Sequence, residues 1–191
     1  MDPTKTEQPE PTVCHVVAMP YPGRSHINAM MNLCKLLASK TADILISFVV
    51  TEEWLGFISS ELKPLAQIRF ATVPNCIPSE VGRGKDFPGF LKAVNTKMEV
   101  HFEELLDRLQ LPVKAIVADT HLYWAIGLGT EGIFRWPHFI LCRRWCSQCC
   151  IILNCSCRTS ISRLICQVSQ NHILRLSILS YIIVYHKTWF S

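Results

Sequence analysis

His26 and Asp119 are the two side chains whose types and positions could carry out proton transfer. His26 follows a Pro/Gly segment, residues 20–23, and Asp119 follows a short apolar run, residues 113–118. An imidazole can take a proton from a hydroxyl near neutral pH, and a carboxylate on its other nitrogen fixes the tautomer and stabilises the imidazolium. The residue types therefore predict a general base and its orienting acid. The plainer alternative is a bystander histidine and an aspartate that caps a helix.

Whether the two meet depends on the elements that carry them. Four short apolar runs predict buried strands, and they comprise residues 14–19, 44–50, 68–73 and 113–118. Apolar positions recur at helical spacing from His26 to Ala38 and in residues 90–109, a short helix is expected within 51–62, and residues 74–89 read as a loop. Strands alternating with helical or loop segments favour parallel βαβ construction.

The fold predicted from this pattern is α/β, with a Rossmann-like parallel sheet. In the common strand order 3-2-1-4, the first and fourth strands are neighbours at the point where the chain reverses direction across the sheet. Open α/β sheets leave a ligand crevice there, outside the carboxyl ends of the strands. His26 follows the first strand and Asp119 the fourth. We therefore expect the two side chains to face each other across that crevice.

Composition changes abruptly near Gly129. Residues 1–129 hold 12 Lys and Arg against 14 Asp and Glu, whereas residues 130–191 hold seven against one, together with seven of the ten cysteines. The net charge of +4 is thus a property of the tail, and no nucleic-acid partner is expected. The polar residues 1–11 show no secretory signal, and the apolar residues 173–185 are too short to span a bilayer. These features predict a cytoplasmic chain without an integral membrane segment.

Two stretches resemble a known family. HVVAMPYPGRSHINAMMNLCKLLA, which contains His26, and IVADTHLYWAIGLG at 116–129, which contains Asp119, are similar to the amino-terminal domain of plant family-1 UDP-glycosyltransferases. The resemblance covers residues 12–129. It implies the amino-terminal, acceptor-binding half of a GT-B fold, with His26 as the general base and Asp119 as the acid that orients it.

The same resemblance implies the reaction. A hexose, expected to be glucose, passes with inversion from a UDP-sugar to a hydroxyl of a small-molecule acceptor, and the UDP-sugar is a co-substrate, so that no cofactor is needed. The chain departs from the family pattern at Ser25, where glycine is usual, and at Ala29, where proline is usual. Neither change removes the base.

An acceptor pocket is expected beside the base. Ser25 lies in the loop that would meet the sugar, and Phe87 and Trp124, with Met19 and Tyr123, could stack against an aromatic acceptor. The alternative is that these side chains pack the core. His121 is interpreted as a position that serves the fold.

Residues 130–191 do not resemble the family's donor-binding domain. We interpret them as an irregular or disordered, aberrant tail, translated out of frame or from an intron, and expect low or no turnover in a chain truncated in this way. Two alternatives stay open: a noncatalytic acceptor-binding module, or a Cys-rich metal-binding protein. The spacing of Cys142, Cys146 and Cys149 is loosely zinc-like, but a second well-spaced pair is missing, so no metal ligand is assigned.

Overall fold

A six-stranded sheet forms the centre of the fold. The computed structural model describes residues 13–60, 65–125, 139–141 and 149–154. The strands are β1 (Cys14–Met19), β2 (Ile44–Thr51), β3 (Ile68–Val73), β4 (Val113–Asp119), β5 (Phe139–Leu141) and β6 (Cys149–Asn154). Their order across the sheet is β3-β2-β1-β4-β6-β5.

The first four strands are parallel, in the predicted order 3-2-1-4. β1 lies between β2 and β4, and its last residue, Met19, is in register with Ala118 of β4. β3 follows on the outer side of β2. The predicted Rossmann-like arrangement is therefore confirmed, and the carboxyl ends of β1 and β4 lie next to each other.

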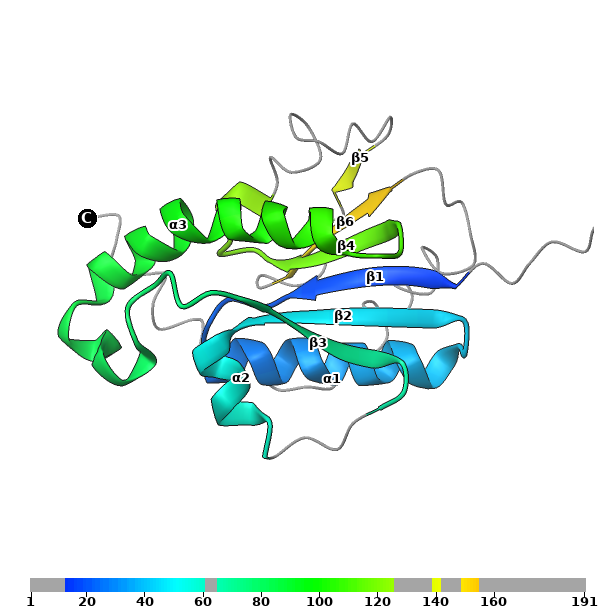
Figure 1. The fold of residues 1–191 in the computed structure, drawn as a ribbon, viewed down its shortest axis with the longest axis horizontal. Coiled ribbons are helices and arrows are strands. Elements are labelled where there is room, and N and C mark those ends of the chain that lie inside the picture. The colour runs from blue at the N-terminus through cyan, green and yellow to red at the C-terminus, as the bar shows by residue number, and fades with distance from the viewer. Residues whose placement is uncertain (1–12, 61–64, 126–138, 142–148, 155–191) are drawn as a thin grey trace, which may run out of the picture.

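Helices cover both faces of the sheet. α1 (Arg24–Lys40) and α2 (Glu52–Ile58) lie on one face, and α3 (Phe87–Arg108) lies on the other (Figure 1). α1 begins two residues before His26, which is where the sequence pattern begins, so that His26 is in its first turn. Each helix connects parallel strands, which is the arrangement of βαβ units.

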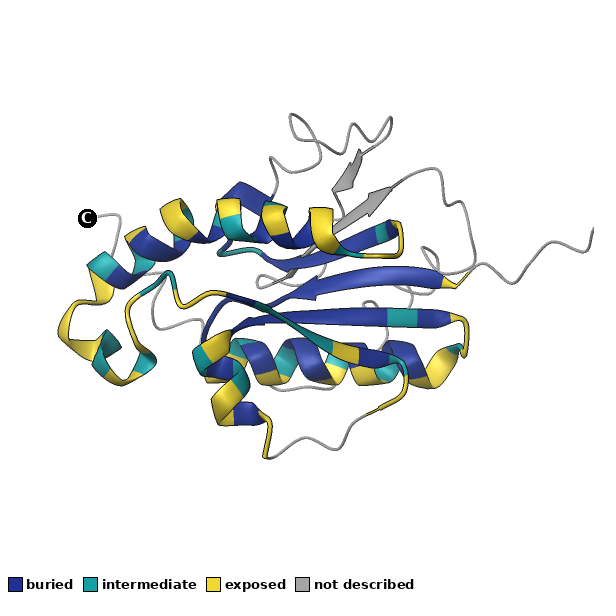
Figure 2. Cartoon of the chain, viewed as in Figure 1, coloured by how far each residue is buried: buried dark blue, intermediate teal, exposed yellow. Residues whose placement is uncertain are grey.

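Alternate residues of the strands face two separate apolar cores. Val16, Ala18 and Phe48 belong to the core under α1 and α2, whereas Val17 and Met19 belong to the core under α3. β1, β2 and β4 are consequently buried along almost their whole length, β3 at the side of the sheet is partly exposed, and the helices are exposed on their outer sides (Figure 2). This burial on both faces explains why the strands read as continuous apolar runs instead of alternating ones.

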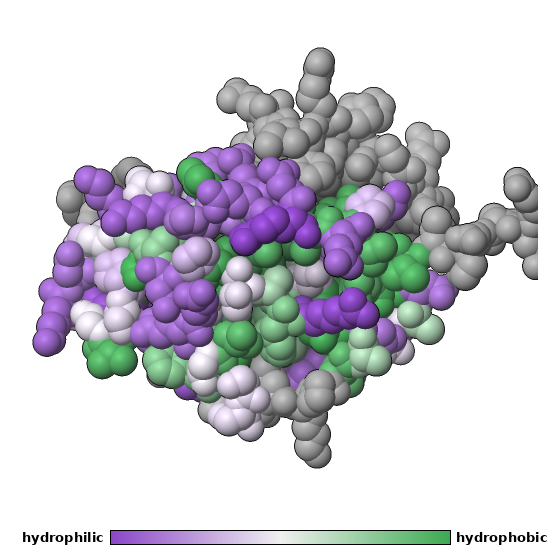
Figure 3. All heavy atoms as spheres, in the orientation of Figure 1, coloured by the Kyte–Doolittle hydropathy of each residue, from purple (hydrophilic) through white to green (hydrophobic). Residues whose placement is uncertain are grey.

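α3 shows the clearest division into two faces. Phe90, Val94, Met98 and Phe102 are buried against the sheet, and hydrophilic side chains cover the outer side of the helix (Figure 3). The Asp86 side chain caps its first turn by accepting a hydrogen bond from the Gly89 N–H at 2.9 Å. The helix starts earlier than the predicted residue 90 because this cap precedes the apolar pattern.

Two parts of the structure differ from the sequence-based expectation. The predicted loop 74–89 contains a 3₁₀ helix, η1 (Glu80–Lys85), and the tail, expected to be irregular, contributes β5 and β6. β6 pairs antiparallel with β4, and β5 pairs antiparallel with β6. Without β6, β4 would be an edge strand with unpaired backbone groups. The short β-branched run at 151–152 suits a strand that pairs with them.

Several expectations concern residues that the structure does not describe. These are the polar tail 1–11, the boundary at residue 129, and the tail positions Cys142 and Cys146. None of the helices in the described part of the chain is long and apolar enough to cross a membrane. The cytoplasmic location stays a prediction.

Candidate active site

The loop between β1 and α1 places His26 at the carboxyl edge of the sheet. Gly23 precedes the helix, and its carbonyl accepts the first helical hydrogen bond from the Ile27 N–H at 2.9 Å. A Cβ at Gly23 would lie 3.2 Å from Arg83 Nη1 and 3.6 Å from the His26 ring. The glycine thus permits a close approach of both side chains to the loop, and the His26 side chain is left 19% exposed.

Asp119 is the last residue of β4, the strand beside β1. Its carboxylate is 3% exposed, and Oδ2 accepts a hydrogen bond from His26 Nδ1 at 2.7 Å. The structure therefore brings the predicted pair into direct contact although 93 positions separate the two residues in the sequence. Their catalytic roles stay predictions.

A second imidazole binds the same carboxylate. His121 lies two residues after Asp119, and both its backbone N–H, at 3.0 Å, and its Nδ1–H, at 2.9 Å, donate to Asp119 Oδ1. The Leu122 N–H donates a hydrogen bond to the Asp119 carbonyl at 3.1 Å. This short turn folds the chain back and brings the His121 side chain to the carboxylate. The interpretation of His121 as a position that only serves the fold is thus incomplete. The signal that could have found it is the i, i+2 spacing of Asp119 and His121, which is typical of an Asx-turn.

These contacts keep Asp119 ionised. Burial alone would raise its pKa, but the hydrogen bonds from His121 and from His26 together outweigh burial and lower the pKa to about 2. The hydrogen bond to Asp119 in turn raises the pKa of His121 against the opposing effect of burial. At neutral pH the carboxylate can only accept, so the hydrogen bonds assign a proton to Nδ1 of each imidazole.

The chemistry available to His26 follows from that tautomer. With the Nδ1 proton held by Asp119, the lone pair of neutral imidazole is on Nε2. Within the described part of the chain, Nε2 makes no hydrogen bond. His26 is thus arranged to take a proton from a hydroxyl placed near Nε2.

Tyr21 and Arg83 surround the pair. The Tyr21 ring lies 5.2 Å from the His26 ring and 5.7 Å from the His121 ring, measured between centroids. Its buried hydroxyl makes no hydrogen bond to the described residues, and burial raises its pKa to about 12 although the positive charge of Arg83 opposes the rise. Tyr21 therefore stays neutral and supports the two imidazoles as an apolar wall.

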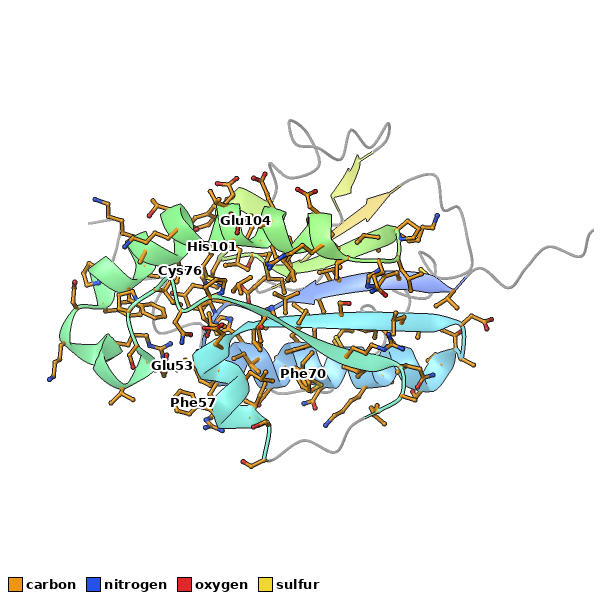
Figure 4. All side chains as sticks on the ribbon, in the orientation of Figure 1. Glu53, Phe57, Phe70, Cys76, His101 and Glu104 are labelled. Atoms are coloured by element: carbon orange, nitrogen blue, oxygen red, sulfur yellow. The ribbon has the colours of Figure 1, made fainter. Side chains whose placement is uncertain are left out.

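A set of polar contacts ties η1 to the loop that carries His26. Arg83 Nη1 donates to the Pro22 carbonyl at 3.2 Å, and its guanidinium lies 2.9 Å from Glu80. Glu53, at the start of α2, accepts hydrogen bonds from the Ser79 hydroxyl at 2.5 Å and from the Glu80 N–H at 3.0 Å. The Glu53 backbone N–H also donates to the Asn75 side chain at 2.8 Å, so that Glu53 lies close to the segment after β3 in which Figure 4 labels Cys76. The segment that contains η1 is thus bonded both to α2 and to the loop before His26.

An apolar hollow lies at the same edge of the sheet. Its lining includes Met19, Thr51 and Val73, which are the last residues of three parallel strands. It also includes Ile27, the residue that follows His26 in α1. Its other lining residues are Pro20, Pro22, Val49, Val50, Trp54, Met98 and Phe102. Its free volume is about 10 Å³, no more than one water molecule needs, so the hollow is a gap in the packing at the strand ends and not a pocket for an acceptor.

The predicted acceptor residues are distributed unevenly. Met19 lines the hollow, and Ser25 is exposed in the first turn of α1, directly before His26, and not in the loop where it was expected. Phe87, at the start of α3, is 50% exposed, and Tyr123 is 67% exposed. Trp124 is instead a core residue.

The placement of Trp124 corrects the expectation that it faces the acceptor. Its indole N–H donates to the Val94 carbonyl at 3.2 Å, and its ring lies 5.6 Å from that of Phe102. The short 3₁₀ turn after β4 directs the ring under α3, where burial of a large apolar side chain is favourable. Sequence reasoning identified an aromatic residue near the strand end but not the direction of its ring.

The three residues His26, Asp119 and His121 also meet the distance requirement of a metal site. One ligand atom from each lies within 4.8 Å of the others. Each Nδ1 atom is, however, already engaged in a hydrogen bond to the carboxylate. Hydrogen bonding accounts for the arrangement, and we assign no metal-ligand role to it. The cysteines of the zinc-like spacing lie in the part of the chain whose side chains are not described.

Comparison with known proteins gives two close relatives over part of the chain. It is 54% identical over 132 residues to UDP-glycosyltransferase 87A2 of Arabidopsis thaliana, an alignment that covers 69% of this chain and 28% of the relative. It is 56% identical over 113 residues to UDP-glycosyltransferase 87A1 of the same plant, covering 59% of this chain and 26% of the relative. The chain thus spans less than a third of the length of these relatives. No protein-family model matches it.

A solved structure shares the fold. The structure of Medicago truncatula UGT71G1 complexed with UDP-glucose superimposes with a TM-score of 0.50, covering 64% of this chain and 28% of the other, at 16% sequence identity. At that identity the likeness concerns the fold alone. It agrees with the parallel sheet and flanking helices expected for the amino-terminal half of a GT-B protein.

Proposed function

This chain belongs to the family of plant UDP-glycosyltransferases, and on that premise we propose that residues 13–125 form the acceptor side of a glycosyl transfer from a UDP-sugar to a small molecule. The observation that supports the proposal most directly is the 2.7 Å hydrogen bond between His26 Nδ1 and Asp119 Oδ2 at the carboxyl edge of the sheet. It provides a proton acceptor at Nε2 and a carboxylate that compensates the charge the imidazole gains.

The proposed step is a single displacement. The acceptor hydroxyl gives its proton to His26 Nε2, and its oxygen forms a bond to the anomeric carbon of the sugar. The bond between that carbon and the diphosphate oxygen breaks, and UDP leaves with the electron pair. Asp119 keeps the Nδ1 proton in place and stabilises the imidazolium without itself being protonated. Because the oxygen attacks opposite to the leaving group, the anomeric centre is inverted.

The proposed substrates are a UDP-hexose, with glucose as the first candidate, and a small molecule that carries a hydroxyl next to an apolar body. The UDP-sugar acts as a co-substrate, so that the step requires no cofactor. The hollow beside α1 is too small to hold that body. We therefore place the acceptor on the surface around His26, where exposed Phe87 and Ser25 are candidates for acceptor contacts.

For a polypeptide of these 191 residues alone we propose acceptor binding with low turnover. The chain spans 28% of the 87A2 relative, and the proposed base contributes to the rate only when a donor is held next to the acceptor. This second function, a noncatalytic acceptor-binding module, uses the same residues. A direct assay separates the two: UDP release from UDP-glucose with a panel of phenols indicates turnover, and phenol binding without UDP release indicates a binding module.

The role of His26 is tested in a hybrid protein. Residues 13–125 replace the matching segment of the 87A2 relative, and UDP release is measured with UDP-glucose and the phenol panel. We expect His26→Ala to lower turnover by about 10²–10⁴-fold, which is the usual contribution of a positioned general base. His101→Ala is the matched control, because this histidine lies on α3 and its ring bonds to Glu104 and not to the Asp119 carboxylate. Near-normal turnover of the His26→Ala hybrid would refute the proposed base.

A further inference from the structure

We propose that His121 is a positioning residue for the His26 base, because it holds the Asp119 carboxylate in the orientation that presents Oδ2 to His26. The inference rests on the proposed function of His26 as the base. It assigns a role to a histidine that the sequence analysis treats as part of the fold, and it concerns a side chain that need not touch the substrate.

The two oxygens of Asp119 have separate partners. Oδ1 accepts both hydrogen bonds from His121, from the backbone N–H at 3.0 Å and from Nδ1–H at 2.9 Å. Oδ2 accepts the hydrogen bond from His26 at 2.7 Å. Rotation of the carboxylate about its Cβ–Cγ bond would break all three bonds, so the contacts of His121 fix the plane in which Oδ2 lies.

Burial makes this fixation important. The Asp119 side chain is 3% exposed, so bulk water has little access to it when a protein donor is lost. A buried carboxylate without sufficient donors turns toward any that remain or becomes protonated. Within the described part of the chain, only His26 and His121 donate to its side-chain oxygens. Loss of the His121 ring donor leaves one backbone N–H to hold Oδ1.

Ring contacts add a second constraint. The His121 and His26 rings lie 5.3 Å apart between centroids at an interplanar angle of 85°, and Tyr21 lies within 5.7 Å of both rings. Among the described residues, Arg83 and Glu80 are the other charged groups that act on Tyr21, and they pair with each other from η1. His121 thus contacts the base directly as well as through the carboxylate.

Two substitutions separate the hydrogen bond from the ring contact. His121→Asn keeps an N–H donor close to the position of Nδ1 but removes the imidazole. His121→Phe keeps a ring of similar size but removes the donor. The backbone N–H bond to Oδ1 is available in both variants. His121→Ala is the second donor-free variant, in case the larger phenylalanine prevents folding.

The experiment uses the full chain and nuclear magnetic resonance. A hydrogen-bonded imidazole Nδ1–H beside a carboxylate gives a proton signal far downfield, and loss of the signal in His26→Gln assigns it to His26. We expect the signal to persist in His121→Asn and to disappear through exchange with water in His121→Phe or His121→Ala. The other amide signals of each variant should remain those of a folded protein. A signal that persists in the donor-free variants, or is lost in His121→Asn, or is absent from the unmodified chain, overturns the proposal.

A second measurement links the position to the rate. In the hybrid protein, the donor-free variants are expected to lower kcat about tenfold with KM for the acceptor unchanged, and His121→Asn is expected to restore most of the loss. An equal loss in His121→Asn contradicts positioning through the hydrogen bond. If His26→Ala stays active, the proposed function fails, whereas the downfield signal still decides whether His121 holds the pair.

Discussion

His15 Nε2 lies 2.8 Å from the Ser47 hydroxyl, which joins β1 to β2 in the interior of the protein. The other ring nitrogen, Nδ1, donates to the Leu111 carbonyl at 3.0 Å. His15 is therefore a neutral imidazole with both nitrogens satisfied, at the end of β1 opposite to His26. The two histidines of this βα unit differ in their surroundings, because both nitrogens of His15 have partners whereas Nε2 of His26 has none among the described residues.

The contribution of His15 to stability is expected to fall when the pH is lowered from 7 to 5. Burial lowers the pKa of His15, so the unfolded chain binds a proton near pH 6.5 that the folded chain does not bind. This stabilisation is present above the unfolded pKa and is lost below it. His121 acts in the opposite direction, because its pKa is raised. The free energy of unfolding, measured with urea at pH 7 and pH 5, should fall more in the unmodified chain than in His15→Gln. The His121 contribution is the same in both proteins. Equal pH dependence in both proteins would contradict the buried neutral imidazole.

A second loss of stability is expected in acid. The pKa of Asp119 falls from 3.8 to about 2 in the folded chain, which corresponds to about 2 kcal/mol of stabilisation above pH 4. This contribution disappears as the pH falls from about 4 to 2. Asp119→Asn should remove it, so unfolding free energies of the two chains should converge at low pH. A constant difference across that range would show that the carboxylate charge does not stabilise the fold.

Asp119→Asn is also expected to impair transfer in the hybrid protein. An amide in this position can donate to Nδ1 and thereby favour the tautomer with the proton on Nε2, which cannot accept the acceptor's proton. We expect a loss of at least about 10²-fold in kcat. Asp107→Asn, on the exposed side of α3, is the control. Comparable turnover of the two variants would argue against an orienting role of Asp119.

The fold could be predicted from the sequence where burial alone dictates the pattern. The four parallel strands are short apolar runs, and their order places His26 and Asp119 together because neighbouring parallel strands end at one edge. The contact of His121 could not be predicted in the same way, because it depends on the direction of one ring in a turn. The packing of Trp124 under α3 depends likewise on a local turn and not on periodicity.

The cap of α3 offers a test of local stability. Asp86 accepts from the Gly89 N–H at 2.9 Å, and a Cβ at Gly89 would lie on the Asp86 carboxylate. Asp86→Ala is expected to lower the unfolding free energy by about 1 kcal/mol, whereas Asp86→Asn should keep most of it because asparagine is an equally good cap. Gly89→Ala should reproduce the loss by displacing the cap. Thermal unfolding of the three variants measures the differences, and an unchanged Asp86→Ala protein would exclude the cap as a stabilising contact.

Glu53 is expected to control the order of η1. Glu53→Ala removes the acceptors of the Ser79 hydroxyl and the Glu80 N–H. Amide hydrogen exchange at Glu80 should therefore become faster, whereas the strands should keep their protection. Glu52→Ala is the matched control, since Glu52 is exposed in the same helical turn. Equal exchange at Glu80 in both variants would show that the Glu53 contacts do not hold η1.

The antiparallel pairing of β6 on β4 has a consequence for the behaviour of the protein in concentrated solution. An uncovered β4 would offer the unpaired backbone N–H and C=O groups of an apolar strand to another molecule. The addition of a strand from a second molecule to such an edge is a common route to aggregation. With β6 and β5 in place, the outermost strands are β5, of three residues, and β3, which carries the exposed Arg69. A short strand and a charged one are poor templates, so the two strands after residue 138 protect the sheet against self-assembly.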